Sequence, residues 1–107
     1  MTVHTPLGEH AVVIGGSVAG MLAARVLCDH FARVTLVERD ELPTQPTFRA
    51  GAPHARHAHG LLVRGQQILE QFFPGLAAEL YDQGALAVNM GREFSVTIGG
   101  TPVAPFQ

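Results

Sequence analysis

The feature that most constrains the fold of this chain is a glycine-rich stretch between two short apolar segments. Residues 11–14 form an apolar run that ends at Gly15, and residues 18–31 carry apolar side chains at helical spacing. A further run, 33–38, is rich in β-branched and apolar residues and closes on an acid, Glu38. Strand, tight turn, helix and strand in this order predict a βαβ unit within an α/β protein.

Each part of this unit has a separate role in binding a dinucleotide. Gly15 permits the sharp turn, and Gly20, which lacks a Cβ, lets the helix pack close to the strand. Free N–H groups and the helix dipole at the helix start attract a pyrophosphate. Glu38 stands 23 residues after Gly15, near the usual spacing of about 20 for an acid that accepts hydrogen bonds from the ribose. Its carboxylate would repel a 2′-phosphate, which argues against NADP in this pocket.

One position departs from the G-x-G-x-x-G pattern, because Ser17 replaces the middle glycine. A serine is small, caps helices and offers a hydroxyl to phosphate, so the mechanism survives the change. The alternative is a tight turn in an unrelated α/β fold. Arg39 either lies over the adenine or is a solvated surface residue. The predicted cofactor-binding residues of this unit are Gly15, Gly16, Ser17, Val18, Ala19, Gly20, Glu38 and Arg39.

Composition narrows the function classes. Hydrophobic residues make up 47% and charged residues 15% of the 107 positions, which predicts a folded chain. The net charge of −2 gives no reason to expect a nucleic-acid partner. All seven basic residues are arginine, so a P-loop lysine and a Schiff-base lysine are both excluded. The single cysteine, Cys28, is expected to be a buried thiol. Neither a signal peptide nor a membrane span is recognisable, and we expect a cytoplasmic protein.

The remaining chain divides by its turn residues. Residues 1–10 are expected to be a leader, 11–40 the βαβ unit, 41–91 a proline-containing loop followed by helices over 60–73 and 74–83, and 92–107 a β-hairpin. The hairpin turn is predicted at Gly99 and Gly100, between alternating apolar and polar residues that include Phe94.

Two segments resemble a known family. The pieces VIGGSVAGMLAARVL and FARVTLVERD resemble the N-terminal FAD-binding unit of FAD-dependent monooxygenases, the aromatic hydroxylase and epoxidase group. RAGAPHARHAHGLL, followed by LEQFFPGL, is similar to a branch that includes bacterial epoxidases of polyketide pathways. The resemblance weakens after Gly91. It implies an incomplete Rossmann-like FAD-binding unit whose C-terminal hairpin belongs to a larger sheet.

The resemblance also implies an activity. In such enzymes NAD(P)H acts as a transient reductant of FAD, and one oxygen atom of O2 passes to a small organic substrate. Because the flavin carries the chemistry, no catalytic residue is assigned here. The resembled enzymes are several times longer and hold a second FAD-binding segment downstream, so we expect an N-terminal portion that is inactive alone. The alternatives are the nucleotide-binding unit of an NAD-dependent oxidoreductase and a non-catalytic truncated remnant.

A cluster of arginine and histidine lies beyond the second predicted strand. In one interpretation His54, His57 and His59 bind a metal, but a zinc site usually recruits a second group of Cys or His, which the chain lacks, and no metal is predicted. In another interpretation the segment is a polar loop. The resemblance favours a third, in which the loop runs along the cofactor. The five candidates are Arg49, His54, Arg56, His57 and His59, of which Arg56 and His57 are the first choices as cofactor-binding residues.

Overall fold

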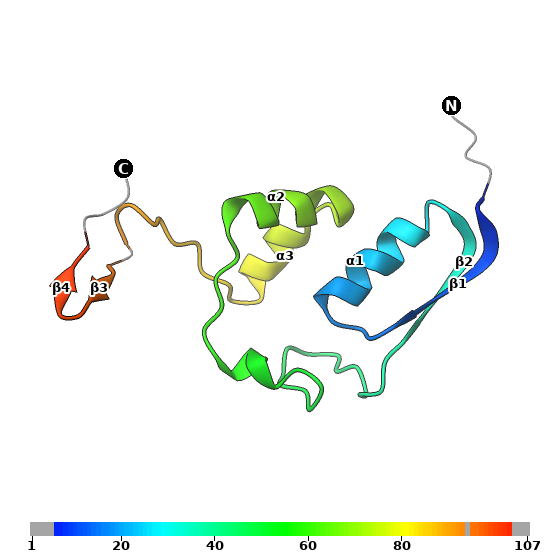
Figure 1. Ribbon diagram of the computed structural model, residues 1–107, viewed down its shortest axis with the longest axis horizontal. Coiled ribbons are helices and arrows are strands. Elements are labelled where there is room, and N and C mark those ends of the chain that lie inside the picture. The colour runs from blue at the N-terminus through cyan, green and yellow to red at the C-terminus, as the bar shows by residue number, and fades with distance from the viewer. Residues whose placement is uncertain (1–5, 94, 104–107) are drawn as a thin grey trace. The chain divides into compact units, whose positions relative to one another are not determined.

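The computed structural model describes residues 6–93 and 95–103, which form a mixed α/β structure (Figure 1). The chain divides into two compact units, residues 1–76 and residues 77–107. In chain order the elements are β1 (Gly8–Ile14), α1 (Val18–Leu27), β2 (Phe31–Val37), the 3-10 helix η1 (Pro53–Arg56), α2 (Val63–Phe72), α3 (Leu76–Asp82), β3 (Thr97–Ile98) and β4 (Thr101–Pro102).

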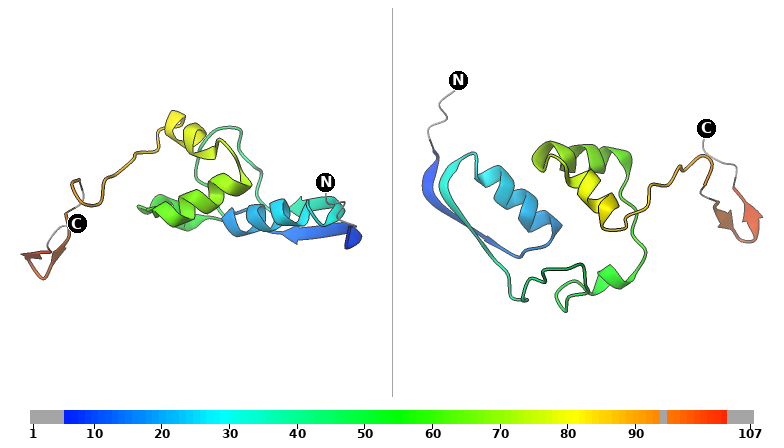
Figure 2. Two further views of the ribbon diagram at one scale, coloured as in Figure 1. Left: turned by 90° about the horizontal axis from the view of Figure 1, so that it is seen from above. Right: turned by 180° about the vertical axis from the view of Figure 1, so that it is seen from behind.

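The first unit is built on a parallel two-stranded sheet. β1 pairs with β2 from Gly8 opposite Phe31 to Ile14 opposite Val37. The helix α1 connects the two strands and contacts both of them. In all three views the order of layers is the sheet, then α1, then α2 (Figures 1 and 2). The predicted strand–helix–strand order with parallel strands is confirmed.

The sheet begins earlier than the sequence predicted, because residues 8–10 belong to β1 and not to a leader. The extension is held by the N–H of Leu7, which donates to the carbonyl of His30 at 2.6 Å. The imidazole of His10 also lies 2.9 Å from the hydroxyl of Thr35 on β2. Residues 1–5 of the expected leader lie outside the described residues.

Helix α1 is shorter than predicted, since it ends at Leu27 and β2 begins at Phe31. The N–H groups of Asp29 and His30 donate to carbonyls only three residues back, at 3.1 and 3.0 Å, which tightens the last turn and stops the α-helix. Cys28 comes directly after the helix and is exposed. The expectation of a buried thiol is therefore wrong.

The side chain of Arg25 links α1 to α2. The Nε of Arg25 donates to the carbonyl of Phe72, the last residue of α2, at 3.1 Å, and its Nη1 pairs with Asp29 at 3.0 Å. An arginine on a helix C-terminus satisfies a carbonyl that has no intrahelical partner. The helix α2 begins at Val63, later than the predicted residue 60, because Leu62 is still extended, with ψ 155°.

Few side chains of the first unit are fully covered. Among the described residues, the apolar side chains classed as buried are Val13 on β1 and Ala52 in the loop before η1. One side of the sheet faces α1, and we call the other side the outer face. Its residues alternate with Val13 along the strands and are Gly8, His10, Val12 and Ile14 on β1 and Phe31, Arg33, Thr35 and Val37 on β2.

The second unit holds most of α3 and a short hairpin. After α3 the chain makes a Schellman turn, in which Gly84 has φ +101° and the N–H of Ala85 donates to the carbonyl of Leu80 at 2.9 Å. β3 and β4 pair antiparallel through the predicted turn at Gly99 and Gly100.

The hairpin is shorter than the predicted range of 92–107. Arg92 and Glu93 lie in a turn, because both of their N–H groups donate to the carbonyl of Asn89. Phe94 and residues 104–107 lie outside the described residues. Every helix in the described part of the chain is too short or too polar to cross a lipid bilayer.

Candidate functional site

The turn between β1 and α1 has the backbone that its glycines predict. Gly15 adopts φ +105°, a conformation that residues with a side chain rarely adopt, and its N–H donates to the carbonyl of Val37 at 2.8 Å. At Gly20 an added Cβ would overlap the carbonyl oxygen of Gly15. The first turn of the helix therefore lies directly on the backbone of the turn, as the spacing of these glycines predicted.

The start of α1 presents backbone donors. The first hydrogen bond of the helix runs from the N–H of Met21 to the carbonyl of Ser17 at 2.9 Å. The N–H groups of Val18, Ala19 and Gly20 come before this first hydrogen bond, so they have no acceptor within the helix. Ser17 is the N-cap residue, and its hydroxyl makes no capping hydrogen bond. Backbone donors in this position stand at the positive end of the helix dipole, which favours negative charge nearby.

Glu38 reaches this turn from the end of β2. Its carboxylate accepts hydrogen bonds from the N–H of Asp40 at 3.2 Å and from the N–H of Gly16 at 2.5 Å. These two donors, together with the charge of Arg49 and the N–H of Arg39, hold the pKa of Glu38 below its ordinary value of 4.5 against an opposing desolvation effect. The acid is therefore ionised at neutral pH and lies against the glycine-rich turn.

Arg49 is the second charged side chain at the turn. Its Nη1 lies 3.5 Å from Oε2 of Glu38, and its Nη2 donates to the carbonyl of Gly16 at 3.3 Å. Both side chains are largely covered, with 16% of Arg49 and 12% of Glu38 exposed. Within the described part of the chain, Nη1 is buried and donates no hydrogen bond. Nη1 of Arg49 is thus held beside the turn and can still donate a hydrogen bond.

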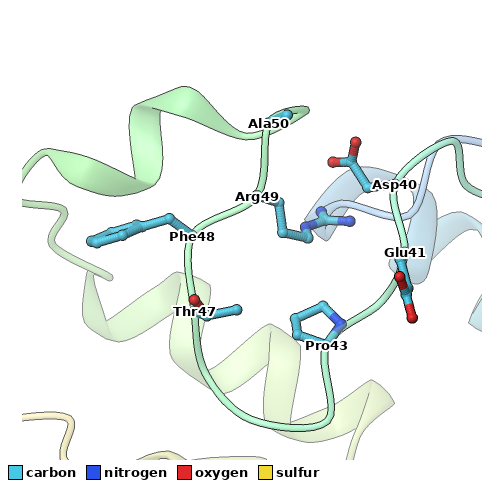
Figure 3. Close-up of a pocket in the computed structure, with 7 residues that line it drawn as sticks. All are labelled: Asp40, Glu41, Pro43, Thr47, Phe48, Arg49 and Ala50. Atoms are coloured by element: carbon cyan, nitrogen blue, oxygen red, sulfur yellow. The ribbon is translucent and has the colours of Figure 1, made fainter.

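A closed loop carries Arg49. The N–H of Gly51 donates to Oδ2 of Asp40 at 2.8 Å, which joins the two ends of the loop. Figure 3 shows Arg49 directed toward the arm that holds Asp40, whereas Phe48 points away from it. Between the arms lies an open hollow of about 250 Å³. Its lining residues are Asp40, Glu41, Pro43, Thr47, Phe48, Arg49 and Ala50.

The two first choices from the arginine and histidine cluster lie elsewhere. Arg56 is exposed and its guanidinium carbon stands 4.8 Å from the centre of the Phe48 ring. His57 is exposed, and its carbonyl is 2.7 Å from Nδ1 of His59. Arg39 is also exposed. Their contact with a cofactor stays a prediction, while Arg49 is the cluster member that the structure brings to the turn.

Sequence reasoning placed Arg49 among five candidates and gave no reason to prefer it. No periodic pattern links it to Glu38, because the loop between them is irregular and contains two prolines, Pro43 and Pro46. The loop is held by Asp40, whose carboxylate accepts the N–H of Gly51, and no sequence pattern indicates that contact. Over residues 6–93 and 95–103, no three His, Cys, Asp or Glu side chains gather as a metal site requires.

No family model matches this chain. It is similar to Protein Rv3254 of Mycobacterium tuberculosis, with 52% identity over 82 residues. The match covers 77% of this chain and 17% of the relative, so the chain spans about a sixth of that protein's length. The relative's name states no activity.

The length of the match limits where it lies. A stretch of 82 residues, wherever it begins in a chain of 107, includes residues 26–82. The matched part therefore contains β2, Glu38 and Arg49, together with the arginine and histidine cluster. The segment that brings Glu38 and Arg49 to the turn therefore lies within the region that aligns with the longer relative.

Proposed function

We propose that this chain is the N-terminal FAD-binding portion of a flavin-dependent monooxygenase or epoxidase, with a Rossmann-like βαβ unit that holds the ADP half of the cofactor. The observation that carries the proposal is the meeting of Glu38 and Arg49 at the turn between β1 and α1. A carboxylate and a guanidinium at one glycine-rich turn suit a dinucleotide, because the carboxylate can accept from a ribose and the guanidinium can pair with a pyrophosphate.

The pyrophosphate side of the proposal rests on donors. The N–H groups of Val18, Ala19 and Gly20 stand at the helix start, and Nη1 of Arg49 is buried without a hydrogen bond. An arginine beside a helix N-terminus suits a diphosphate, because both supply N–H groups and positive potential. The missing Cβ of Gly20 keeps the helix start close to the turn. These residues fit the pyrophosphate of a dinucleotide.

The ribose side rests on Glu38. An ionised carboxylate accepts hydrogen bonds from the two hydroxyls of an unmodified ribose, and the lowered pKa of Glu38 keeps it ionised. The acid stands at the carboxyl end of β2, which is where open α/β sheets place their ligands. A 2′-phosphate at this position would meet a like charge.

The choice of FAD over a nicotinamide cofactor rests on the elements that come after β2. A nicotinamide-binding fold continues with further parallel βα units. Here the described chain continues with a long loop, two short helices and an antiparallel hairpin. The resemblance to FAD-dependent monooxygenases supports the same choice. When bound, FAD would supply the redox and oxygen chemistry, and the residues of this chain would bind and orient its ADP half.

The test is a titration of the 107-residue chain monitored by amide NMR. We expect ADP-ribose and FAD to bind weakly and to shift the amides of Val18, Ala19 and Gly20, and 2′-phospho-ADP-ribose to bind less well. Arg49→Met should lower the affinity roughly tenfold or more, as loss of a charged hydrogen bond does. The control is Arg64→Met, which removes an exposed arginine of α2 and should leave the affinity unchanged.

Two results would contradict the proposal. One is the absence of shifts at the turn at millimolar ligand. The other is an equal loss of affinity in Arg49→Met and Arg64→Met. The redox half is tested on the longer relative, because purified Protein Rv3254 should absorb as an oxidised flavin. A bound nicotinamide in place of flavin would favour the NAD-dependent alternative.

A further inference from the structure

Asp40 is connected to both charged side chains of the candidate site. Its backbone N–H donates to Oε1 of Glu38 at 3.2 Å, and its carboxylate accepts the N–H of Gly51, close to Arg49, at 2.8 Å. We propose that Asp40 is a positioning residue, which sets the affinity for a dinucleotide by holding Arg49 at the glycine-rich turn. The inference rests on the proposed function, and it assigns a role to a residue that sequence reasoning did not place in the site.

The contacts that Arg49 makes with the turn are long. Its Nη1 stands 3.5 Å from Oε2 of Glu38 and donates no hydrogen bond within the described part of the chain, and its Nη2 is 3.3 Å from the carbonyl of Gly16. Both distances exceed the usual range of about 2.7–3.2 Å for an N–H donor. The 2.8 Å bond between Gly51 and Asp40 is shorter and ends on a carboxylate, so it is the stronger contact. The loop therefore places the guanidinium of Arg49 beside the turn.

The backbone next to Arg49 is held on the side of Gly51. The N–H of Ala52 donates to the carbonyl of Arg49 at 3.1 Å, and Ala52 is only 8% exposed. Figure 3 shows the side chain of Arg49 extending from its own arm of the loop toward the arm that carries Asp40. Gly51 lies two residues after Arg49. A bond from Gly51 to Asp40 thus fixes the direction in which the arginine leaves the loop.

The space at Gly51 is filled by the carboxylate of Asp40. A Cβ added to Gly51 would lie 2.5 Å from Oδ2 of Asp40, closer than real Cβ atoms approach an oxygen. The φ of Gly51 is not positive, so its backbone conformation does not itself require glycine. The absence of a side chain at this position therefore serves the approach of the carboxylate, and the two arms of the loop are packed together there.

The charge of Asp40 and its hydrogen bond act on an anionic ligand in opposite directions. A carboxylate near a pyrophosphate repels it, so removing the charge alone should raise the affinity. Removing the hydrogen bond lets the loop leave the turn, and the apparent affinity falls with the fraction of chains in which the loop is closed. The N–H that donates to Glu38 belongs to the backbone and stays when the side chain of Asp40 is changed. A measured loss of affinity would therefore identify the hydrogen bond to Gly51.

The experiment is an amide NMR titration of the 107-residue chain with ADP-ribose. Asp40→Ala should lower the affinity roughly fivefold to tenfold, because it removes the hydrogen bond that closes the loop. Asp40→Asn should keep the native affinity, since its amide oxygen can still accept the N–H of Gly51. The matched control is Glu41→Ala, which removes an exposed acid from the same arm of the loop and should not lower the affinity.

A double-mutant cycle tests whether the effect passes through Arg49. In the Arg49→Met background, Asp40→Ala should cause no further loss of affinity, because the guanidinium that the loop positions is already absent. Gly51→Ala disturbs the same contact from the other side, so it should lower the affinity of the native chain and have no effect in Asp40→Ala. Amide exchange of Gly51 and Ala52 should be faster in Asp40→Ala, whereas exchange in β2 should stay native.

Three results would overturn the inference: native affinity in Asp40→Ala, an equal loss of affinity in Asp40→Asn and Asp40→Ala, or losses that add in full in the double variant with Arg49→Met. If exchange in β2 also rises in Asp40→Ala, the comparison is made with Gly51→Ala, and native affinity in that variant overturns the inference. Failure of the proposed function looks different, because the native chain would then show no shifts at the start of α1. Binding that depends on Arg49 but not on Asp40 overturns this inference alone.

Discussion

The replacement of Gly20 by alanine separates the packing of α1 from its helical propensity. Inside a helix, an exchange of glycine for alanine normally stabilises by about 1 kcal/mol. At Gly20 the added Cβ would overlap the carbonyl oxygen of Gly15. Overpacking costs about 1–3 kcal/mol, and the upper end applies because the obstacle is backbone and not a side chain that can rotate. The expected net effect is a loss of about 2 kcal/mol, opposite in sign to propensity.

The assay is hydrogen exchange of the α1 amides in the 107-residue chain. A loss of about 2 kcal/mol corresponds to exchange about 30-fold faster. The control is Gly60→Ala, where an added Cβ meets nothing within 4 Å, and it should leave exchange in α1 unchanged. Slower exchange in Gly20→Ala than in the native chain would refute the reasoning, because it would mean that α1 does not lie on the turn.

Three further outcomes are expected. Because the folded-state pKa of Glu38 is below its ordinary value of 4.5, its stabilising contribution is complete above that pH and is lost as the pH falls through the lower folded value. The protection of the Gly16 amide, measured against the intrinsic exchange rate at the same pH, should therefore decrease in acid, and in Glu38→Gln this step should be missing. Gly15→Val should abolish dinucleotide binding, since φ +105° excludes a β-branched residue, whereas Gly60→Val should retain it; equal affinities would place the ligand elsewhere. The 107-residue chain alone should bind FAD only weakly and show no NAD(P)H-dependent oxygen uptake, and a stoichiometric flavin with turnover would contradict this.

The sequence predicted the parts of the fold that depend on local chemistry. The parallel pair β1–β2, the turn at Gly15 and the close packing at Gly20 arise from residue types at fixed spacing. Element boundaries were less well predicted, because they depend on pairing across the sheet. Residues 8–10 contain no apolar run, yet they lie in β1 because Phe31 and Arg33 pair with them.

Sequence patterns indicated the glycines and the acid of the candidate site but did not single out its arginine. Arg49, Arg56 and the histidines between and after them all lie within one short segment beyond Glu38, and spacing alone does not say which of them returns to the turn. That choice is made by the loop, which Asp40 closes on the N–H of Gly51. Irregular loops held by single side-chain contacts have no periodicity, so their geometry was beyond pattern reasoning.

The loop closed by Asp40 and Gly51 also has a consequence for proteolysis. Trypsin can cut this chain only after its arginines, because there is no lysine. Arg39 and Arg56 are exposed. The side chain of Arg49, in contrast, donates a hydrogen bond to the carbonyl of Gly16, and the Arg49 carbonyl accepts the N–H of Ala52 at 3.1 Å. A protease needs a bond that can open into an extended strand. If the loop is packed against the glycine-rich turn, trypsin should cleave after Arg39 and Arg56 before it cleaves after Arg49. This order can be measured without any ligand.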